Sequence, residues 1–313
     1  MPTQWRSGEQ PVAGALTGAP ATTLERVIPF WFAAGDGAYQ PEQRDTYLDL
    51  MQTLYGEFDD LSWLDGGALV SYHDMADTVF RALGPALDGV DLVVTVQASP
   101  DCRQQSFPGC RLTDLLSGDP FMFGISEQGV AGPFLALRMA VDRLTRGLSH
   151  RALVLVMEQS TLPPDATAIR PAHDVAVAIV LGPDGPVPIG RPVLTVTGRA
   201  GLDTPVATIG EPVDPASPGN DAAALVVGHN LADLVPGPGV TVTRGAPGHA
   251  CAGVWLALAR LLADNGGTPG GRVLVVDQDP VLPYLCSVDL TLPVVAMPEL
   301  TARPAQRESE LAG

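Results

Sequence analysis

The segment Val130-Ala-Gly-Pro-Phe-Leu-Ala-Leu-Arg-Met-Ala140 recurs 121 residues later as Cys251-Ala-Gly-Val-Trp-Leu-Ala-Leu-Ala-Arg-Leu261. Five of the eleven aligned positions are identical, and the alignment needs no gap. The same register continues further along the chain, where Arg151-Ala-Leu-Val-Leu-Val aligns with Arg272-Val-Leu-Val-Val-Asp. Two separate segments that share one register indicate an internal duplication.

Each copy has the same local pattern. A turn of small residues opens an apolar helix, a polar loop follows, and a β-branched strand comes next, at Ala152–Met157 and at Val273–Asp277. Helices that are apolar on nearly all faces are buried, and strands without polar alternation are covered on both faces. Further runs of this strand type are Leu92–Val96, Val175–Leu181, Val193–Val196 and Ala224–Val227. The pattern predicts two α/β halves in a five-layer α-β-α-β-α architecture.

Composition sets the expected domain organisation. We expect a flexible N-terminal arm over residues 1–23, an N-terminal half over 24–185, a C-terminal half over 186–300 and a polar tail over 301–313. The arm is rich in Gly, Ala, Pro and Thr and lacks the continuous apolar stretch of a secretory signal. No window of the chain reaches the roughly 18 apolar residues of a membrane span, so the expected location is the cytoplasm.

Charge and cysteine content exclude several functions. The formal net charge of −17 argues against a nucleic-acid partner, because phosphate binding needs a cationic surface. We expect no metal and no cofactor, since the cysteines lack metal-type spacing and no Gly-rich phosphate loop is present. Reduced, mostly structural thiols are expected at the four cysteines, Cys102, Cys110, Cys251 and Cys286.

Five segments, taken in order, resemble ketoacyl-ACP synthase III of the thiolase superfamily. They are Phe107-Pro-Gly-Cys-Arg-Leu, Phe123-Gly-Ile-Ser-Glu-Gln-Gly-Val-Ala-Gly132, His173-Asp-Val-Ala-Val-Ala-Ile-Val-Leu, Val227-Gly-His-Asn230 and Pro247-Gly-His-Ala250. The second resembles the family's nucleophile turn, commonly Gln-Gly-Cys-Ala-Gly, and the third resembles its Gly-Asp-Gly-Ala strand with both glycines lost. The resemblance runs from about Arg26 to Pro298 and implies the thiolase fold.

The resemblance places Val130 where the family has a cysteine thiolate at the start of a buried helix. An isopropyl group has no lone pair, so acyl transfer to this side chain is excluded. Two relocated nucleophiles stay open. Ser126 is a candidate, although a hydroxyl bonded to the turn backbone is the more common state. Cys251 occupies the repeat-related helix start, although a buried, unreactive thiol is more common there.

Two histidines are the candidate catalytic residues. By the resemblance, His229 and His249 face the pocket and donate hydrogen bonds to a thioester carbonyl oxygen or its enolate. The alternative is an inert cleft in which backbone carbonyls hold both rings. Asn230 either orients His229 or caps a helix that starts there. Glu127 and Gln128 either add polar character to the cleft or are residues of the turn only. The expected substrate-binding residues are Gln128, Asn230 and Cys251.

Three functions stay open at this stage. The first is a non-catalytic subunit that pairs with a cysteine-containing synthase in specialised-metabolite biosynthesis. The second is a cysteine-independent decarboxylase or acyltransferase that acts on acyl or malonyl thioesters through His229 and His249. The third is an inert binder of acyl-CoA or acyl-carrier protein, although an acidic chain is a poor match for an acidic carrier protein. The expected assembly is a homodimer or a heterodimer with such a synthase.

Overall fold

The computed structural model describes most of the chain. The described residues are 22–33, 39–103, 112–113, 115–116, 118–164, 169–196, 224–231, 234, 239–264 and 270–293. Cys110, the predicted tail and nearly all of the predicted N-terminal arm lie outside these ranges, and β1 begins at Thr23, where the arm was expected to end.

The N-terminal part of the chain forms sheet A, with the strand order β3-β2-β4-β5-β1-β6. Its strands are β1 (Thr23–Phe32), β2 (Leu92–Gln97), β3 (Phe121–Ser126), β4 (Ala152–Glu158), β5 (Asp174–Gly182) and β6 (Val187–Pro188). β2 is parallel to β3 and β4, whereas β5 is antiparallel to β4 and β1.

Sheet B repeats this arrangement, with the order β7-β11-β10-β8-β9. Its strands are β7 (Val193–Val196), β8 (Ala224–Val227), β9 (Thr241–Arg244), β10 (Gly271–Gln278) and β11 (Tyr284–Leu292). β8 is parallel to β9 and β10, and β11 is antiparallel to β10 and β7. β7 to β11 therefore correspond in order and direction to β1 to β5, which confirms the predicted duplicated halves.

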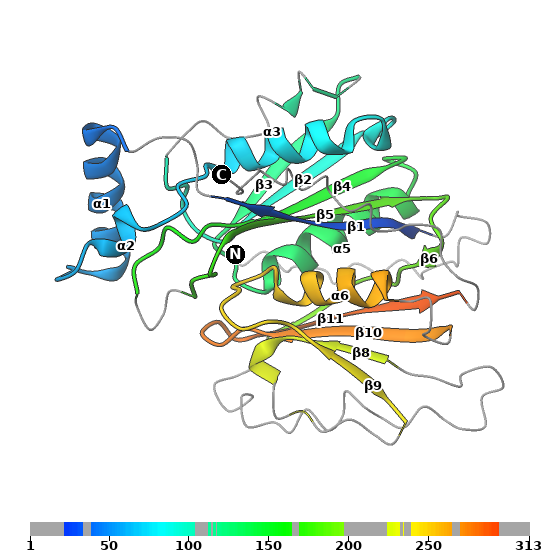
Figure 1. Ribbon diagram of the computed structural model, residues 1–313. Helices are drawn as coiled ribbons and strands as arrows, with labels where there is room; N and C mark the ends of the chain where they lie inside the picture. The colour runs from blue at the N-terminus through cyan, green and yellow to red at the C-terminus, as the bar shows by residue number, and fades with distance from the viewer. Residues whose placement is uncertain are drawn as a thin grey trace, which may run out of the picture.

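Two buried helices lie between the sheets (Figure 1). They are α5 (Ala131–Thr145) and α6 (Gly253–Ala263), the two copies of the repeated segment. Phe134 of α5 packs against Trp255 of α6 with ring centroids 5.0 Å apart, and these residues are related by the 121-residue offset. A residue that contacts its own repeat partner lies at the pseudo-two-fold axis. The central core therefore forms around this axis.

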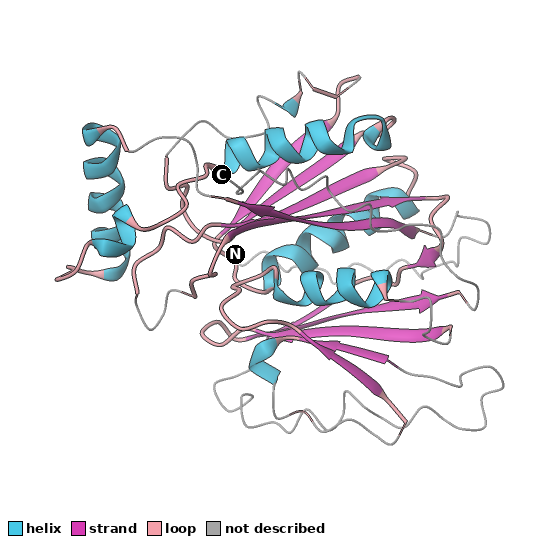
Figure 2. Ribbon diagram, in the orientation of Figure 1, coloured by secondary structure: helices cyan, strands magenta, loops and turns pink. Residues whose placement is uncertain are grey.

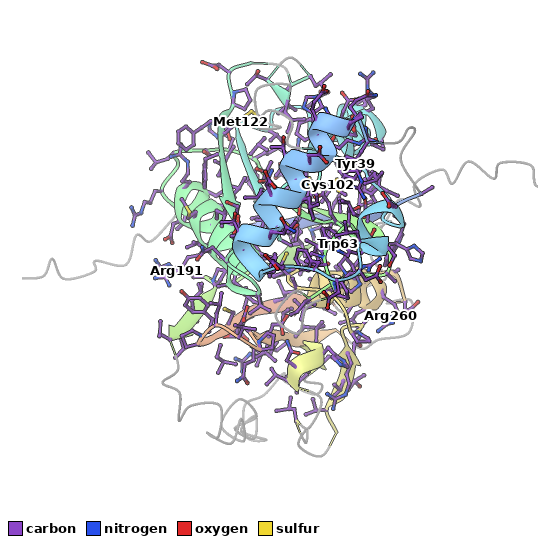
Figure 3. The ribbon with its side chains drawn as sticks, turned by 90° about the vertical axis from the view of Figure 1, so that its left-hand side faces the viewer. Tyr39, Trp63, Cys102, Met122, Arg191 and Arg260 are labelled. Atoms are coloured by element: carbon purple, nitrogen blue, oxygen red, sulfur yellow. The ribbon has the colours of Figure 1, made fainter. Side chains whose placement is uncertain are left out.

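Outer helices cover sheet A. α3 (Tyr72–Leu83) and η1 (Gly84–Leu87) pack on its outer face, and the Ser71 hydroxyl accepts a hydrogen bond from the Asp74 amide to cap α3. α1 (Pro41–Tyr55) and α2 (Ser62–Asp65) surround an aromatic cluster near Tyr39, Trp63 and Cys102 (Figure 3). Below sheet B the described chain has the short helix η4 (His229–Leu231), as Figure 2 shows. Among the described helices, none is long and apolar enough to cross a membrane.

The predicted strands are all present, and two details differ from expectation. Val193 and Val196 of β7 are 55% and 71% exposed, so this strand is not covered on both faces. β7 is an edge strand, and within it Leu194 supplies the contact with the central core. Sheet A also extends beyond residue 185, because β6 pairs with β1 before Ile189 bridges to sheet B.

Candidate active site

The site begins at the turn between β3 and α5. Glu127 and Gly129 both adopt left-handed backbone conformations, with φ of 57° and 50°. Such a conformation is unfavourable for glutamate and easy for glycine. A Cβ atom on Gly129 would lie 1.9 Å from Oδ2 of Asp279, so glycine is required there for space as well. The turn places Val130 at the start of α5, where this residue is 2% exposed.

Asp279, which directly follows β10, caps the start of α5. The Val130 amide donates a hydrogen bond of 3.0 Å to Oδ2 of Asp279. Oδ1 of the same carboxylate accepts bonds from the amides of Val281 and Leu282, at 2.9 and 2.7 Å. A carboxylate at a helix N-terminus is favourable, because unsatisfied amides give that end a partial positive charge. Asp279 is thus fixed in place by three backbone amides.

The start of α6 is built in the same way. Glu158, the last residue of β4, accepts hydrogen bonds through Oε1 from the amides of Cys251 and Ala252. Its Oε2 accepts a bond of 2.6 Å from Nδ1 of His249. The side chains of His249 and Glu158 are 7% and 1% exposed. This buried carboxylate fixes the orientation of the imidazole and leaves Nε2 without a hydrogen-bond partner among the described residues.

Glu158 and Asp279 are related by the 121-residue offset, as are Val130 and Cys251. Each carboxylate comes from the end of a strand in one half and binds the start of the central helix in the other half. The two contacts are therefore equivalent under the pseudo-two-fold symmetry. The sequence reasoning missed both carboxylates, although an acidic residue at equivalent positions of the repeat was a readable signal.

A cavity of about 220 Å³ lies between the two helix starts. Glu127 and Gly129 of the first turn, Ala250 of the second, and the carboxylates Glu158 and Asp279 contribute to its wall. The rest of the lining combines apolar side chains, such as Leu162 and Leu282, with polar ones, such as Ser99 and Gln159. The cavity is therefore acidic at the helix starts and of mixed polarity beyond them.

Burial and neighbouring carboxylates control the acidity of the groups around this cavity. Burial raises the pKa of the Cys251 thiol well above its usual value, and the adjacent Glu158 carboxylate raises it further. Burial also raises the pKa of Asp277 to about 7. A thiol with such a pKa is protonated near neutral pH and is a poor nucleophile.

The two predicted catalytic histidines differ in burial and in the contacts that they make. His249 is largely buried and bound to Glu158, whereas His229 is exposed on η4. No ring contact joins them within the part of the chain that the structure describes. His249 instead makes an edge-to-face contact with Trp31, with centroids 6.4 Å apart. The pairing of these histidines on one substrate atom stays a prediction.

The residues that line the cavity do not include the other predicted residues. Asn230 is exposed within η4, and its side-chain amide donates a hydrogen bond of 3.0 Å to the carbonyl of Gln278. Gln128 is exposed, and its amide binds the carbonyl of Ser126 at 3.3 Å. Ser126 is the exposed last residue of β3, and Cys251 is buried. Within the described residues, no group of His, Cys, Asp and Glu could hold a metal ion.

Solved structures share this architecture. An OleA variant from Xanthomonas campestris, with bound lauric acid and lauroyl-CoA, has a TM-score of 0.56 and 15% identity over 88% of this chain and 100% of that chain. The priming β-ketosynthase from the R1128 polyketide biosynthetic pathway has a TM-score of 0.55 and 21% identity over 88% and 97%. A 3-oxoacyl-(acyl carrier protein) synthase III from Xanthomonas oryzae has a TM-score of 0.54 and 15% identity over 87% and 99%.

The chain has the thiolase fold. The strand order and the two central helices agree with the match over nearly the whole length of these structures. No protein-family model and no curated protein sequence matches the chain. The thiolase fold places the starts of α5 and α6 at one cleft, and the activity has to be argued from the residues found there.

Proposed function

We propose that this chain is an auxiliary subunit without a covalent nucleophile, which pairs with an active synthase in polyketide or fatty-acyl biosynthesis. The observation that carries the proposal is Val130. At the helix start where ketoacyl-ACP synthase III-like proteins have cysteine, this chain has an isopropyl group that is 2% exposed. Such a group can neither accept an acyl chain nor ionise. We place the protein in the cytoplasm with its partner.

The nearby alternatives do not replace the missing nucleophile. Cys251 is buried, and burial raises its pKa well above the usual thiol value. Ser126 lies on the exposed end of β3, and no described histidine or carboxylate is bonded to its hydroxyl. A hydroxyl needs an adjacent general base to become nucleophilic. Both observations support a non-catalytic role.

The edge strand β3 supports pairing with another subunit. β3 ends sheet A, and none of its six residues is buried. Phe121 is 53% exposed, and the Arg143 guanidinium lies 4.8 Å from the centre of its ring. Met122 is on the same strand (Figure 3), and Met139 of α5 is 37% exposed. An exposed apolar edge favours pairing with another strand. The occupant we propose is the corresponding edge strand of a cysteine-containing, thiolase-fold synthase.

Co-expression with a cysteine-containing, thiolase-fold synthase tests the pairing. Light scattering of the purified protein should give a 1:1 heterodimer, and Phe121→Asp should abolish it. The matched control is Val196→Asp, because Val196 is also an exposed apolar residue on an edge strand, in sheet B. A chain that forms only homodimers or monomers in the presence of the synthase would refute the heterodimer, as would equal loss of assembly in both variants.

A second candidate function rests on the His249–Glu158 pair. A carboxylate that orients a buried imidazole through Nδ1 leaves Nε2 to act on a substrate. This arrangement favours the alternative of a cysteine-independent decarboxylase or acyltransferase on acyl or malonyl thioesters. The test is turnover of malonyl-CoA by the chain alone and by its His249→Ala and His229→Ala variants. Turnover that both substitutions leave unchanged would remove this candidate.

A further inference from the structure

The amides at the two helix starts are not open to an external anion, because carboxylates of the chain itself already bind them. Asp279 binds the Val130 amide and Glu158 binds the amides of Cys251 and Ala252. Asp279 and Glu158 are 4% and 0% exposed. A second anion that approached the start of α5 would therefore meet a carboxylate where it would otherwise meet an amide.

Space at the start of α5 is equally limited. Oδ2 of Asp279 lies so near Gly129 that a single added Cβ atom would be 1.9 Å from it. The carboxylate cannot simply rotate away, because Oδ1 is held by the amides of Val281 and Leu282. An anionic ligand can occupy this position only if the turn between β10 and β11 moves.

The repeat-related position provides an internal comparison. Cys251 is a thiol at the start of α6, faced by Glu158 as Val130 is faced by Asp279. Its pKa is raised by burial and then by Glu158, Asp277 and Asp279. A helix N-terminus without such neighbours lowers a thiol pKa, whereas a nearby carboxylate raises it.

We propose that the turn Asp279–Pro283 is an autoinhibitory element, in which Asp279 is a tethered anion that excludes a thiolate or an anionic acyl ligand from the start of α5. The proposal goes beyond the auxiliary role, because it gives the site a second block that is independent of Val130 and of any partner. Restoring cysteine alone would then leave the site unreactive.

The test compares the reactivity of an introduced thiol. The variants are Val130→Cys alone, Val130→Cys with Asp279→Asn, and Val130→Cys with Glu127→Gln. Asparagine keeps the shape of the side chain and removes the charge. Glu127 is the matched control, because it is an exposed carboxylate of the same turn without a bond to the Val130 amide. Iodoacetamide alkylation is followed from pH 6 to 9 by peptide mass spectrometry, which reads the introduced thiol separately from the native ones.

We expect the introduced thiol to react at least about tenfold faster at pH 7 in the Asp279→Asn background than in Val130→Cys alone. Lowering the thiol pKa by one unit raises the fraction of reactive thiolate about tenfold. The Glu127→Gln background should change the rate less than about twofold, because water screens an exposed charge. Equal rates with and without Asp279 would overturn the proposal, and so would equal acceleration in the Glu127 background. Circular dichroism checks folding, and Asp279→Ser repeats the comparison if the asparagine variant does not fold. A failed heterodimer test would leave this outcome unchanged.

Discussion

Replacing Glu158 by alanine should destabilise the native protein by several kilocalories per mole. The carboxylate accepts three hydrogen bonds, from the amides of Cys251 and Ala252 and from Nδ1 of His249. Each buried donor that loses its acceptor costs about 1–3 kcal/mol. Glu158 lines the cavity, so water can replace part of the lost bonding. We therefore take the lower part of the range and expect a loss of about 3–5 kcal/mol.

The assay is urea unfolding followed by circular dichroism, with the free energy of unfolding extrapolated to water. Glu158→Gln keeps one acceptor oxygen and loses the charge, so its expected cost is about 1–2 kcal/mol. The exposed Glu127 provides the control, because Glu127→Gln should change stability by less than about 0.5 kcal/mol. A loss below about 1 kcal/mol for Glu158→Ala would refute the reasoning, since three unsatisfied donors cannot cost so little.

Three further predictions concern groups around the cleft. Burial raises the pKa of Asp277 to about 7, so the native state retains a proton that the unfolded chain releases near pH 4. The free energy of unfolding should therefore fall as pH rises from about 4 through about 7. Asp277→Asn should therefore be more stable than the parent at pH 8 in urea unfolding, and an unchanged pH dependence would contradict this. Gly228→Ala should destabilise the native protein by about 1–3 kcal/mol, because the added Cβ would lie 1.7 Å from Oδ1 of Asp277. An unchanged melting temperature would contradict this and show that the Asp277 side chain moves freely. Burial raises the pKa of Cys251 well above the usual range and that of Cys286 to about 12, so both should resist iodoacetamide at pH 8 until the protein is unfolded. Rapid labelling of native Cys251, read by peptide mass spectrometry, would count against its burial.

Much of the fold could be predicted from the sequence, because its signals are local. The apolar runs Val193–Val196 and Ala224–Val227 predicted two strands, and β7 and β8 have the same bounds. The repeated segment predicted both buried central helices, because their apolar residues extend around the helix. Exposure of β7 could not be predicted, since a short apolar run has the same composition in a sheet interior and at an edge.

The candidate site was predictable only in part. The small-residue turn before α5 and the start of α6 were identified correctly, because both lie within the repeat. Glu158 and Asp279 were missed, because each acts across the interface between the two halves. The exposure of His229 depends on the path of η4, which follows from tertiary packing and not from local pattern.

The most direct test of the account is intact-protein mass spectrometry after incubation with acyl-CoA, with a cysteine-containing synthase as the positive control. Because Val130 lies at the helix start and Cys251 is a buried thiol of raised pKa, we predict no acyl adduct on this chain while the synthase is acylated. A stable adduct on this chain, mapped by peptide analysis to Cys251 or Ser126, would contradict the central claim that it has no covalent nucleophile.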